Sequence, residues 1–209
     1  MTPDYSFRNI RLYNCDCMEF MKDIPDNFYE LAIVDPPYGI GMDGGKRGKA
    51  IYIKKNWDKI IPSQQYFIEL FRISQNQIIW GGNYYMLPPT PCVIIWDKKN
   101  GNSFFGDGEI AWTSFKSVVK ILPLAHIGRY NAEPKKIHPT QKPVNLYNWL
   151  LSNYAQKGDK IFDSHGGSFS SACACLDMGF EFDGCEIDSD YFESAVKRIK
   201  NHNQEYIRF

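Results

Sequence analysis

The chain has 209 residues, of which 44% are hydrophobic and 15% aromatic, and its formal net charge is zero. This length is enough for one α/β domain, and the composition is typical of a soluble globular protein. No apolar run approaches the roughly 18 residues of a membrane-spanning helix, and the N-terminus lacks the layout of a secretory signal. We therefore expect a cytoplasmic protein without a transmembrane helix.

Short apolar runs in the first two thirds of the chain predict buried strands. The run at 31–35 ends at two prolines, which remove backbone donors and force a turn. Further strands are predicted at 77–80 and 92–96, with two short ones within 109–121. Helices are predicted at 64–75, from the spacing of its apolar residues, and at 144–156, which begins after a proline.

The last third reads as a compact βαβ unit. Its predicted elements are a strand at 160–163, a turn of small residues, a helix at 168–178, a strand at 181–186 and a helix at 189–202. Strands that alternate with helices predict an α/β fold, with a mostly parallel sheet and helices on both faces. We expect a single domain over 1–209, in which 98–136 forms a small insertion.

Two groups of basic residues stand out against the neutral total. The first lies in 41–57, which has no periodicity and predicts a mobile loop; its members are Lys46, Arg47, Lys49, Lys54 and Lys55. The second comprises Arg129, Lys135, Lys136 and Lys142. Both groups suit contacts with phosphates on one face, and both are equally compatible with solvated loops.

Six cysteines occur, two pairs of them in Cys-x-Cys spacing: Cys15, Cys17, Cys92, Cys173, Cys175 and Cys185. Zinc sites usually use Cys-x-x-Cys, and secreted disulfide frameworks are shorter and denser. We therefore predict reduced and mostly buried thiols, and we assign no metal.

Three predicted strands end in an acid, at Asp35, Asp163 and Glu186. Ligands of open α/β sheets bind at these carboxyl ends. The small-residue turn after Asp163 lets a ligand approach a helix N-terminus, and Glu186 is placed to accept hydrogen bonds from ribose hydroxyls. The pattern predicts a nucleoside-cofactor site, with simple packing of helix against sheet as the alternative.

Asp35, Pro36, Pro37 and Tyr38 supply a second chemistry. The exocyclic amine of a nucleobase is a poor nucleophile, because its lone pair is delocalised into the ring. Asp35 and the backbone carbonyl of Pro36 can accept its N–H groups and favour a pyramidal nitrogen, while Tyr38 offers a stacking face. A strand-end turn with a packed tyrosine is the alternative.

The chain resembles the S-adenosylmethionine-dependent amino-methyltransferases of DNA in their β-group motif order, in which the catalytic motif precedes the cofactor motif. Five segments carry the resemblance: Asn14–Cys17, Asp35–Tyr38, Trp80–Tyr84, His138–Pro143, and Phe162–Asp163 through Glu186–Asp188. They run from about residue 10 to residue 200 in the order typical of the family. The resemblance implies a Rossmann-like methyltransferase fold.

The resemblance also implies roles for individual residues. The catalytic residues would be Asp35, Pro36, Pro37 and Tyr38, and the cofactor would contact Asp16, Cys17, Asp35, His138, Thr140, Gln141, Lys142, Asp163, Ser164, His165, Gly166, Gly167, Ser168, Glu186 and Ile187. Within this set, Lys142 would lie at the carboxylate end of the cofactor. One position departs from the family pattern: Phe169 stands where a glycine is usual, so its side chain is expected to crowd the cofactor or shift the turn.

These residues predict an enzyme that methylates the N6 amine of a flipped adenine in double-stranded DNA. An N4-cytosine methyltransferase and a weakly active or inactive DNA-binding relative are the alternatives, and methylation of protein glutamine or RNA ranks below them. We expect a monomer or homodimer from a bacterium or phage. A cognate restriction endonuclease is possible as a partner but leaves no trace in this sequence.

Overall fold

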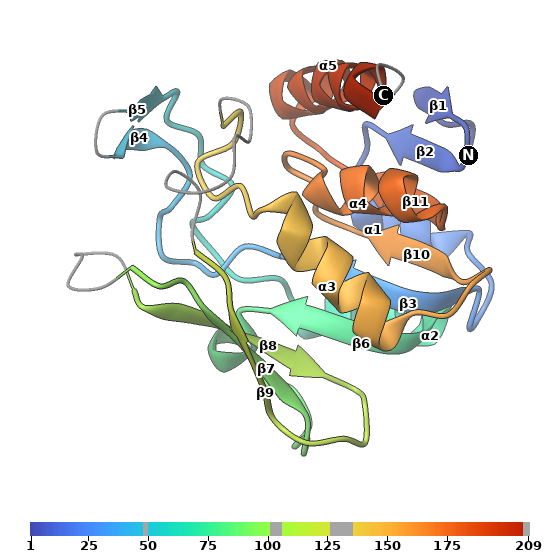
Figure 1. The fold of residues 1–209 in the computed structure, drawn as a ribbon, viewed down its shortest axis with the longest axis vertical. Coiled ribbons are helices and arrows are strands. Elements are labelled where there is room, and N and C mark those ends of the chain that lie inside the picture. Colours follow the sequence, from blue (N-terminus) through green and yellow to red (C-terminus); the bar gives the residue numbers. More distant parts are fainter. Residues whose placement is uncertain (48–49, 101–105, 126–135, 207–209) are drawn as a thin grey trace.

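A computed structural model describes residues 1–47, 50–100, 106–125 and 136–206. Within these residues, nine strands form one sheet (Figure 1). Across the sheet, the order is β1 (Tyr5–Phe7), β2 (Ile10–Tyr13), β11 (Glu181–Cys185), β10 (Lys160–Asp163), β3 (Tyr29–Val34), β6 (Ser74–Trp80), β8 (Gly108–Thr113), β7 (Val93–Asp97) and β9 (Lys120–Pro123).

The centre of this sheet is parallel. Strands β2, β11, β10, β3 and β6 run in one direction, and β1 and β8 add antiparallel partners on either side of them. Because β10 and β3 are parallel neighbours, Asp163 and Asp35 emerge at the same edge of the sheet. The predicted α/β class and mostly parallel sheet are confirmed.

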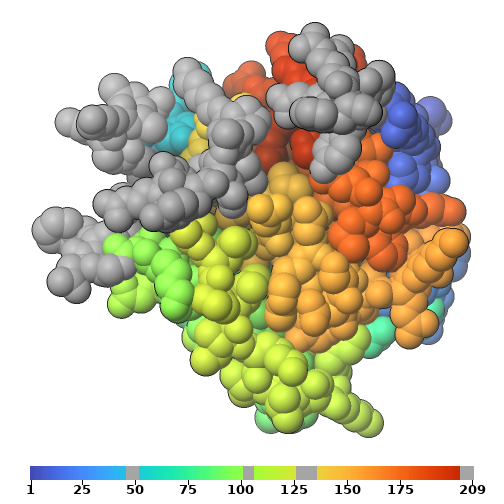
Figure 2. Space-filling model, viewed as in Figure 1, coloured from blue at the N-terminus to red at the C-terminus, as the bar shows by residue number. Residues whose placement is uncertain are grey.

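Helices cover both faces of the sheet. On one face lie α1 (Cys17–Lys22) and α2 (Gln64–Ile73), and on the other α3 (Val144–Tyr154), α4 (Ser170–Met178) and α5 (Ser189–Tyr206). Helix α2 shows why this sequence folds so: Tyr66, Phe67, Leu70 and Ile73 recur at helical spacing, and all four are buried. In the space-filling view, α3 and α4 hide most of the strands behind them (Figure 2).

The cysteines are free and lie mainly in these cores. All except Cys15 are buried, which confirms the prediction of buried thiols. In the part of the chain that the structure describes, no helix combines the length and apolar character needed to cross a membrane.

Two regions differ from the sequence-based expectation. Residues 41–57 contain a hairpin of β4 (Gly45–Arg47) and β5 (Ala50–Tyr52), where we expected a loop without regular structure. Within 98–136, β8 and β9 are strands of the main sheet, paired with β6 and β7. The strands β8 and β9 overlap the two short strands predicted within 109–121, and their pairing with β6 and β7 makes the described part of 98–136 continuous with the main sheet. The mobility of 41–57 stays a prediction.

Candidate active site

The Asp35–Tyr38 turn is held by two side chains from elsewhere in the chain. The buried carboxylate of Asp58 accepts hydrogen bonds from the backbone N–H groups of Tyr38 and Gly39, both at 2.8 Å, and from that of Met42 at 2.6 Å. The hydroxyl of Tyr85 donates to the carbonyl of Pro36 at 2.7 Å. The turn is therefore rigid, and its carbonyl is fixed in direction.

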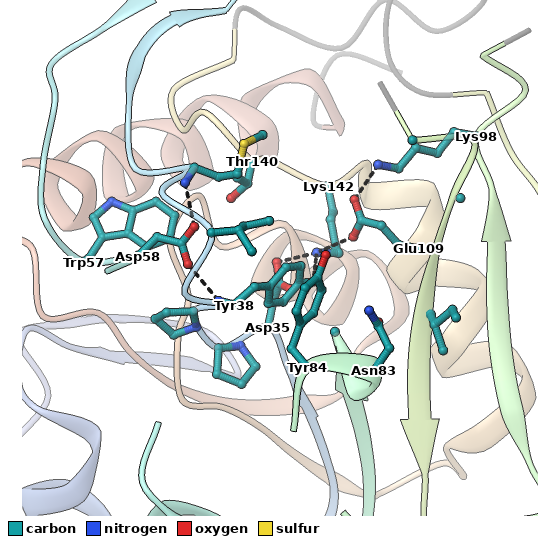
Figure 3. A pocket seen from close by; sticks show the side chains of 18 residues that line it. Asp35, Tyr38, Trp57, Asp58, Asn83, Tyr84, Lys98, Glu109, Thr140 and Lys142 are labelled. Carbon is teal, nitrogen blue, oxygen red and sulfur yellow. Dashed lines mark hydrogen bonds and ion pairs between the residues drawn. The ribbon is translucent and has the colours of Figure 1, made fainter. Parts of the chain in front are cut away.

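Asp35 is the first member of a chain of alternating charges (Figure 3). Its Oδ1 accepts a hydrogen bond from the Tyr38 hydroxyl at 2.6 Å, and its Oδ2 forms an ion pair with Lys142. The Lys142 Nζ also lies 3.0 Å from Glu109 Oε2, and Lys98 Nζ lies 2.6 Å from the other carboxylate oxygen of Glu109. Two anions and two cations thus alternate along one wall.

Burial and these neighbours act against each other on the pKa values. Burial raises the pKa of Asp35, and the ammonium of Lys142 offsets part of that rise. Burial also acts to raise the pKa of Glu109, but Lys142 and Lys98 outweigh it and lower this pKa to about 2. For Lys142, burial acts to lower the pKa, and the two carboxylates reverse the effect and raise it. Glu109 and Lys142 therefore hold each other in their charged forms, whereas burial keeps the pKa of Asp35 above its ordinary value.

An aromatic stack stands beside these charges. The rings of Tyr38 and Tyr84 lie 4.9 Å apart at 15°, and Tyr84 is 40% exposed. Gly81 makes this stack possible, because a Cβ there would lie 2.3 Å from the Tyr38 ring. Its φ of +71° also favours glycine. Around the stack and the charges lies a cavity of about 290 Å³, lined by Asp35–Tyr38, Trp57, Asp58, Gly81, Asn83, Tyr84, Lys98, Glu109, Thr140 and Lys142 among others.

The tip of β10 brings together the second half of the predicted site. The buried carboxylate of Asp163 accepts hydrogen bonds from Ser171 Oγ at 2.6 Å and from the backbone N–H of His165 at 3.1 Å. The Ser164 hydroxyl bridges Tyr66, at 2.6 Å, and the imidazole of His165, at 2.8 Å. Burial raises the pKa of Asp163 to about 7 and lowers that of His165 to about 4, so the imidazole is neutral at pH 7.

Glu186 lies at the tip of the neighbouring strand. Its carboxylate accepts hydrogen bonds from the backbone N–H groups of Gly167, at 2.7 Å, and Asp188, at 2.8 Å, and burial raises its pKa to about 7. Next to it, Ile187 exposes 64% of its surface. A buried acceptor beside an exposed apolar side chain suits a ribose hydroxyl pair next to an adenine ring. These residues therefore fit a nucleoside cofactor.

Phe169 does not project from the turn. The φ of Phe169 is +50°, a backbone conformation that favours glycine, the residue usual at this position in the family that the chain resembles. The Phe169 side chain is nevertheless fully buried. The ring lies against Gly166 and Gly184 and makes edge contacts with Phe182 and Phe192, at centroid distances of 6.2 and 6.5 Å. The expected crowding of the cofactor is therefore wrong, because the ring enters the hydrophobic core beneath the turn.

The segment from His138 to Lys142 lies between the two halves. His138 stacks on Trp57 at 5.2 Å, and burial lowers its pKa to about 3. The Nε2 of Gln141 is buried without a hydrogen-bond partner among the described residues, so a donor suited to a carboxylate is left over. Lys142, which we expected at the carboxylate end of the cofactor, instead places its ammonium against Asp35.

The remaining predicted residues have other contacts. Asp16 caps α1 by accepting a hydrogen bond from the backbone N–H of Met18 at 2.8 Å, and Cys17 is the buried first residue of that helix. Ser168 is buried, and its carbonyl accepts a hydrogen bond from Arg198 at 2.8 Å. The role of these three residues toward a cofactor stays a prediction.

Of the basic residues predicted to meet DNA, two have partners within the chain. Lys54 pairs with Asp43, and Lys55 pairs with Asp188, at 2.8 Å, and Asp190, at 2.6 Å. Lys46 and Arg47 belong to β4. Lys49, together with Arg129 and Lys135, lies outside the described residues.

Comparison with known proteins agrees with this geometry. A family model for N6 and N4 methyltransferases, described as DNA methylase, matches residues 95–197. The Type II methyltransferase M2.MboI of Moraxella bovis is 22% identical over 96% of this chain and 94% of its own length. The putative methylase YubD of Escherichia coli K12 is 21% identical over 90% of this chain and 89% of its own length.

Two solved structures share the fold. The complex of M1.HpyAVI with S-adenosylmethionine has a TM-score of 0.59 at 20% identity and covers 90% of this chain and 99% of its own. The cytosine-N4-specific PvuII DNA methyltransferase has a TM-score of 0.65 at 14% identity, over 100% of this chain and 95% of its own. The fold is therefore that of the Rossmann-like methyltransferases. The matched family model covers residues 95–197, so this part of the chain is similar to the N6/N4 DNA methylases, and β3 precedes β10 as in the β-group order.

Sequence reasoning missed several residues of the site. Asp58 and Tyr85 fix the turn, Tyr84 extends the aromatic stack, and Glu109 and Lys98 complete the chain of charges. Only Tyr84 carried a signal, because it ends the Trp80–Tyr84 segment that resembles the family. The other four come from separate strands and loops, and no local pattern marks them.

Proposed function

We propose that this protein is an S-adenosylmethionine-dependent DNA methyltransferase that acts on the exocyclic N6 amine of an adenine flipped out of double-stranded DNA. The observation that carries the proposal is the carboxylate of Asp35, held by a rigid turn at the wall of an aromatic cavity. A carboxylate rather than a serine at this position is typical of the adenine enzymes of the family. The DNA adenine methyltransferase YhdJ of Escherichia coli K12, 32% identical over 34% of this chain, gives further support.

The flipped base would stack on the aromatic surface that Tyr84 and Tyr38 form together, with the ring of Tyr38 on the inner side. That ring is oriented by the hydrogen bond from its hydroxyl to Asp35 and by contact with Gly81. Since Tyr84 is exposed and stacks on the same ring, it would supply additional aromatic surface at the mouth of the cavity. Stacking of a base on an aromatic side chain contributes about 1–3 kcal/mol and depends little on sequence.

Two acceptors would then hold the amine. Asp35 would accept one N–H, and the carbonyl of Pro36 would accept the other. That carbonyl has two lone pairs, and the Tyr85 hydroxyl uses one of them, so the second is available to the substrate. With both hydrogens held, the nitrogen lone pair is drawn out of conjugation and points away from the ring.

When bound, S-adenosylmethionine would supply an electrophilic methyl group: the amine would displace the sulfonium sulfur, which leaves as a neutral thioether, and the methylated nitrogen would lose a proton, without a covalent enzyme intermediate. Gly167, Glu186 and Ile187 would hold its nucleoside, and Gln141 its carboxylate end. The tips of β10 and β11 lie at the same edge of the sheet as the catalytic turn, which would bring the methyl group near the amine.

Two surfaces would recognise the DNA. We assign phosphate contacts to the basic residues of 41–57 and target recognition to 98–136. Lys46 and Arg47 lie on the β4–β5 hairpin, and β8, which carries Glu109, lines the cavity from the second of these regions.

The test is the identity of the methylated nucleoside. DNA from cells that express the chain is digested and analysed by mass spectrometry, beside DNA from cells that express Asp35→Ala. We expect N6-methyladenine only with the unaltered chain. N4-methylcytosine in its place would transfer the proposal to cytosine, and methylation that persists with Asp35→Ala would refute the role of Asp35.

A further inference from the structure

In this structure, an ammonium is paired with the carboxylate that would hold the substrate amine. Lys142 Nζ is paired with Asp35 Oδ2 and lies 3.4 Å from the Tyr38 hydroxyl. The Lys142 side chain is only 4% exposed, so it has no direct exit to water. Asp35 Oδ2 has a second lone pair, but a target amine bound there would lie against the Lys142 ammonium, so binding favours a shift of Lys142 away from Asp35.

Breaking that pair without compensation would be costly. A buried cation that loses its partner strongly destabilises a protein. Glu109 provides the compensation, because its Oε2 lies 3.0 Å from the same ammonium. That oxygen is buried and has no well-aligned hydrogen bond among the described residues, so a small movement of Lys142 would improve its geometry.

We propose that Glu109 is a positioning residue that takes over Lys142 when the target amine binds Asp35. In the free enzyme, Lys142 bridges Asp35 and Glu109. As the base enters, the ammonium shifts toward Glu109, and Asp35 Oδ2 turns to the amine. Lys98, 2.6 Å from Glu109 Oε1, keeps the Glu109 carboxylate fixed and ionised throughout.

The balance of charge favours this exchange during methyl transfer. The amine nitrogen becomes cationic as the methyl group bonds to it, and Asp35 stabilises that charge. An uncompensated Lys142 ammonium nearby would oppose it, whereas a Lys142 neutralised by Glu109 would not. The inference rests on the proposed methyl transfer at Asp35, but its electrostatic part can be measured without substrate.

Several groups influence the charge of Asp35. Lys142 and Tyr38 contact it directly, and Glu109 faces it across the Lys142 ammonium. Farther away, the charge of Asp35 also acts on three groups on other elements, namely Tyr85, Tyr147 and Asp163. Among these groups, Glu109 is the anion next to Lys142 that can be neutralised by substitution while the Lys142 ammonium stays in place beside Asp35.

The main variant is therefore Glu109→Gln, with Glu109→Asp as the conservative replacement. In Glu109→Gln, Lys142 pairs with Asp35 alone, so we expect kcat to fall about 10- to 100-fold while KM for DNA changes little. The acid limb of the kcat–pH profile should move to lower pH, since the full positive charge then favours the ionised form of Asp35. Glu109→Asp should restore most of kcat.

Two further variants make the test specific. Lys98→Met removes a cation from the far end of the chain of charges, so it should move the acid limb in the opposite direction, to higher pH. Glu109 keeps Lys142 as an ion-pair partner in this variant, and the methionine side chain retains the apolar part of the lysine. Glu193→Gln repeats the same chemical change at an exposed position of α5 and should leave kcat and its pH profile unchanged.

A direct measurement avoids dependence on activity. With ¹³C-carboxyl-labelled aspartate, the Asp35 signal can be assigned by its loss in Asp35→Asn and titrated by NMR without DNA or cofactor. We expect the Asp35 pKa to be lower in Glu109→Gln and higher in Lys98→Met than in the unaltered chain. If Glu109→Gln does not fold, the inference is tested by the Asp35 titration in Lys98→Met.

The outcomes are distinguishable. The first outcome assumes that the unaltered chain is active. If kcat and the Asp35 titration are then the same in Glu109→Gln and Lys98→Met as in the unaltered chain, the inference is overturned. So would a Glu109→Gln effect confined to KM for DNA, since that would make Glu109 a DNA contact. An unaltered chain that binds S-adenosylmethionine but methylates no DNA would overturn the proposed function instead, while the NMR titration would still test the ion-pair exchange.

Discussion

Gly81 allows a quantitative test of the aromatic platform, through Gly81→Ala. The added Cβ would lie 2.3 Å from Tyr38 Cε1, far inside contact distance, and the backbone is left-handed with φ of +71°. The left-handed conformation costs about 1–2 kcal/mol for alanine, and overpacking adds about 1–3 kcal/mol. The free energy of unfolding should therefore fall by about 2–5 kcal/mol, and Tyr38 should be displaced.

The matched control is Gly179→Ala, at the C-cap of α4. Its φ is +76°, but no atom lies within 4 Å of the added Cβ, so it has the backbone cost without the clash. Urea unfolding should show the smaller loss of about 1–2 kcal/mol. Methylation assays should show a kcat about 100-fold lower in Gly81→Ala and unchanged in Gly179→Ala. Equal stability and equal kcat in the two variants would refute the steric argument.

Three more predictions follow from the site. Tyr38→Phe keeps the stacking face but removes the hydrogen bond to Asp35, so kcat should fall about 10-fold, and less than in Tyr38→Ala, in single-turnover assays. Asp163 has a folded-state pKa of about 7, which is above its unfolded value. Between about pH 4 and 7 the folded state therefore binds more protons than the unfolded state, and the free energy of unfolding falls as pH rises through this range. The stability of Asp163→Asn relative to the unaltered chain, measured by urea unfolding, should therefore increase from pH 4 to 7; a flat difference would contradict the burial argument. Phe169→Gly relieves the positive φ but leaves a cavity in the core. The free energy of unfolding should therefore fall by about 2–4 kcal/mol, although glycine is the residue usual in the family at this position. A gain in stability would contradict the core position of the ring.

The parts of the fold that could be predicted are those that local pattern determines. The strands that end at Asp35, Asp163 and Glu186 were found because each apolar run stops at an acid. Strands β1 and β2 were not, since β2 has four residues, one of them Arg11, and is stabilised by parallel pairing with β11 from the far end of the chain. Its sequence alone carries too little periodicity to indicate a strand.

The site divides in the same way. The resemblance to the family located Asp35, Tyr38 and Lys142, but it gave Lys142 a different partner from the one in the structure. Glu109 and Asp58 reach the site only in the folded chain. Folding brings β8, which carries Glu109, and the segment after β5, which carries Asp58, to the catalytic turn. Contacts of this kind depend on long-range topology, and spacing along the chain contains no information about them.

The burial of Phe169 has a consequence for how this chain can vary. Its ring fills the volume that any side chain at 166 or 184 would need, since a Cβ at Gly166 would lie 2.1 Å from the ring and one at Gly184 2.5 Å from it. The three positions therefore share one space and cannot change independently. Relatives that have a small residue at the position of Phe169 should tolerate alanine or serine at 166. Position 184 should stay restricted, because a Cβ there would also lie 2.6 Å from the Phe182 ring.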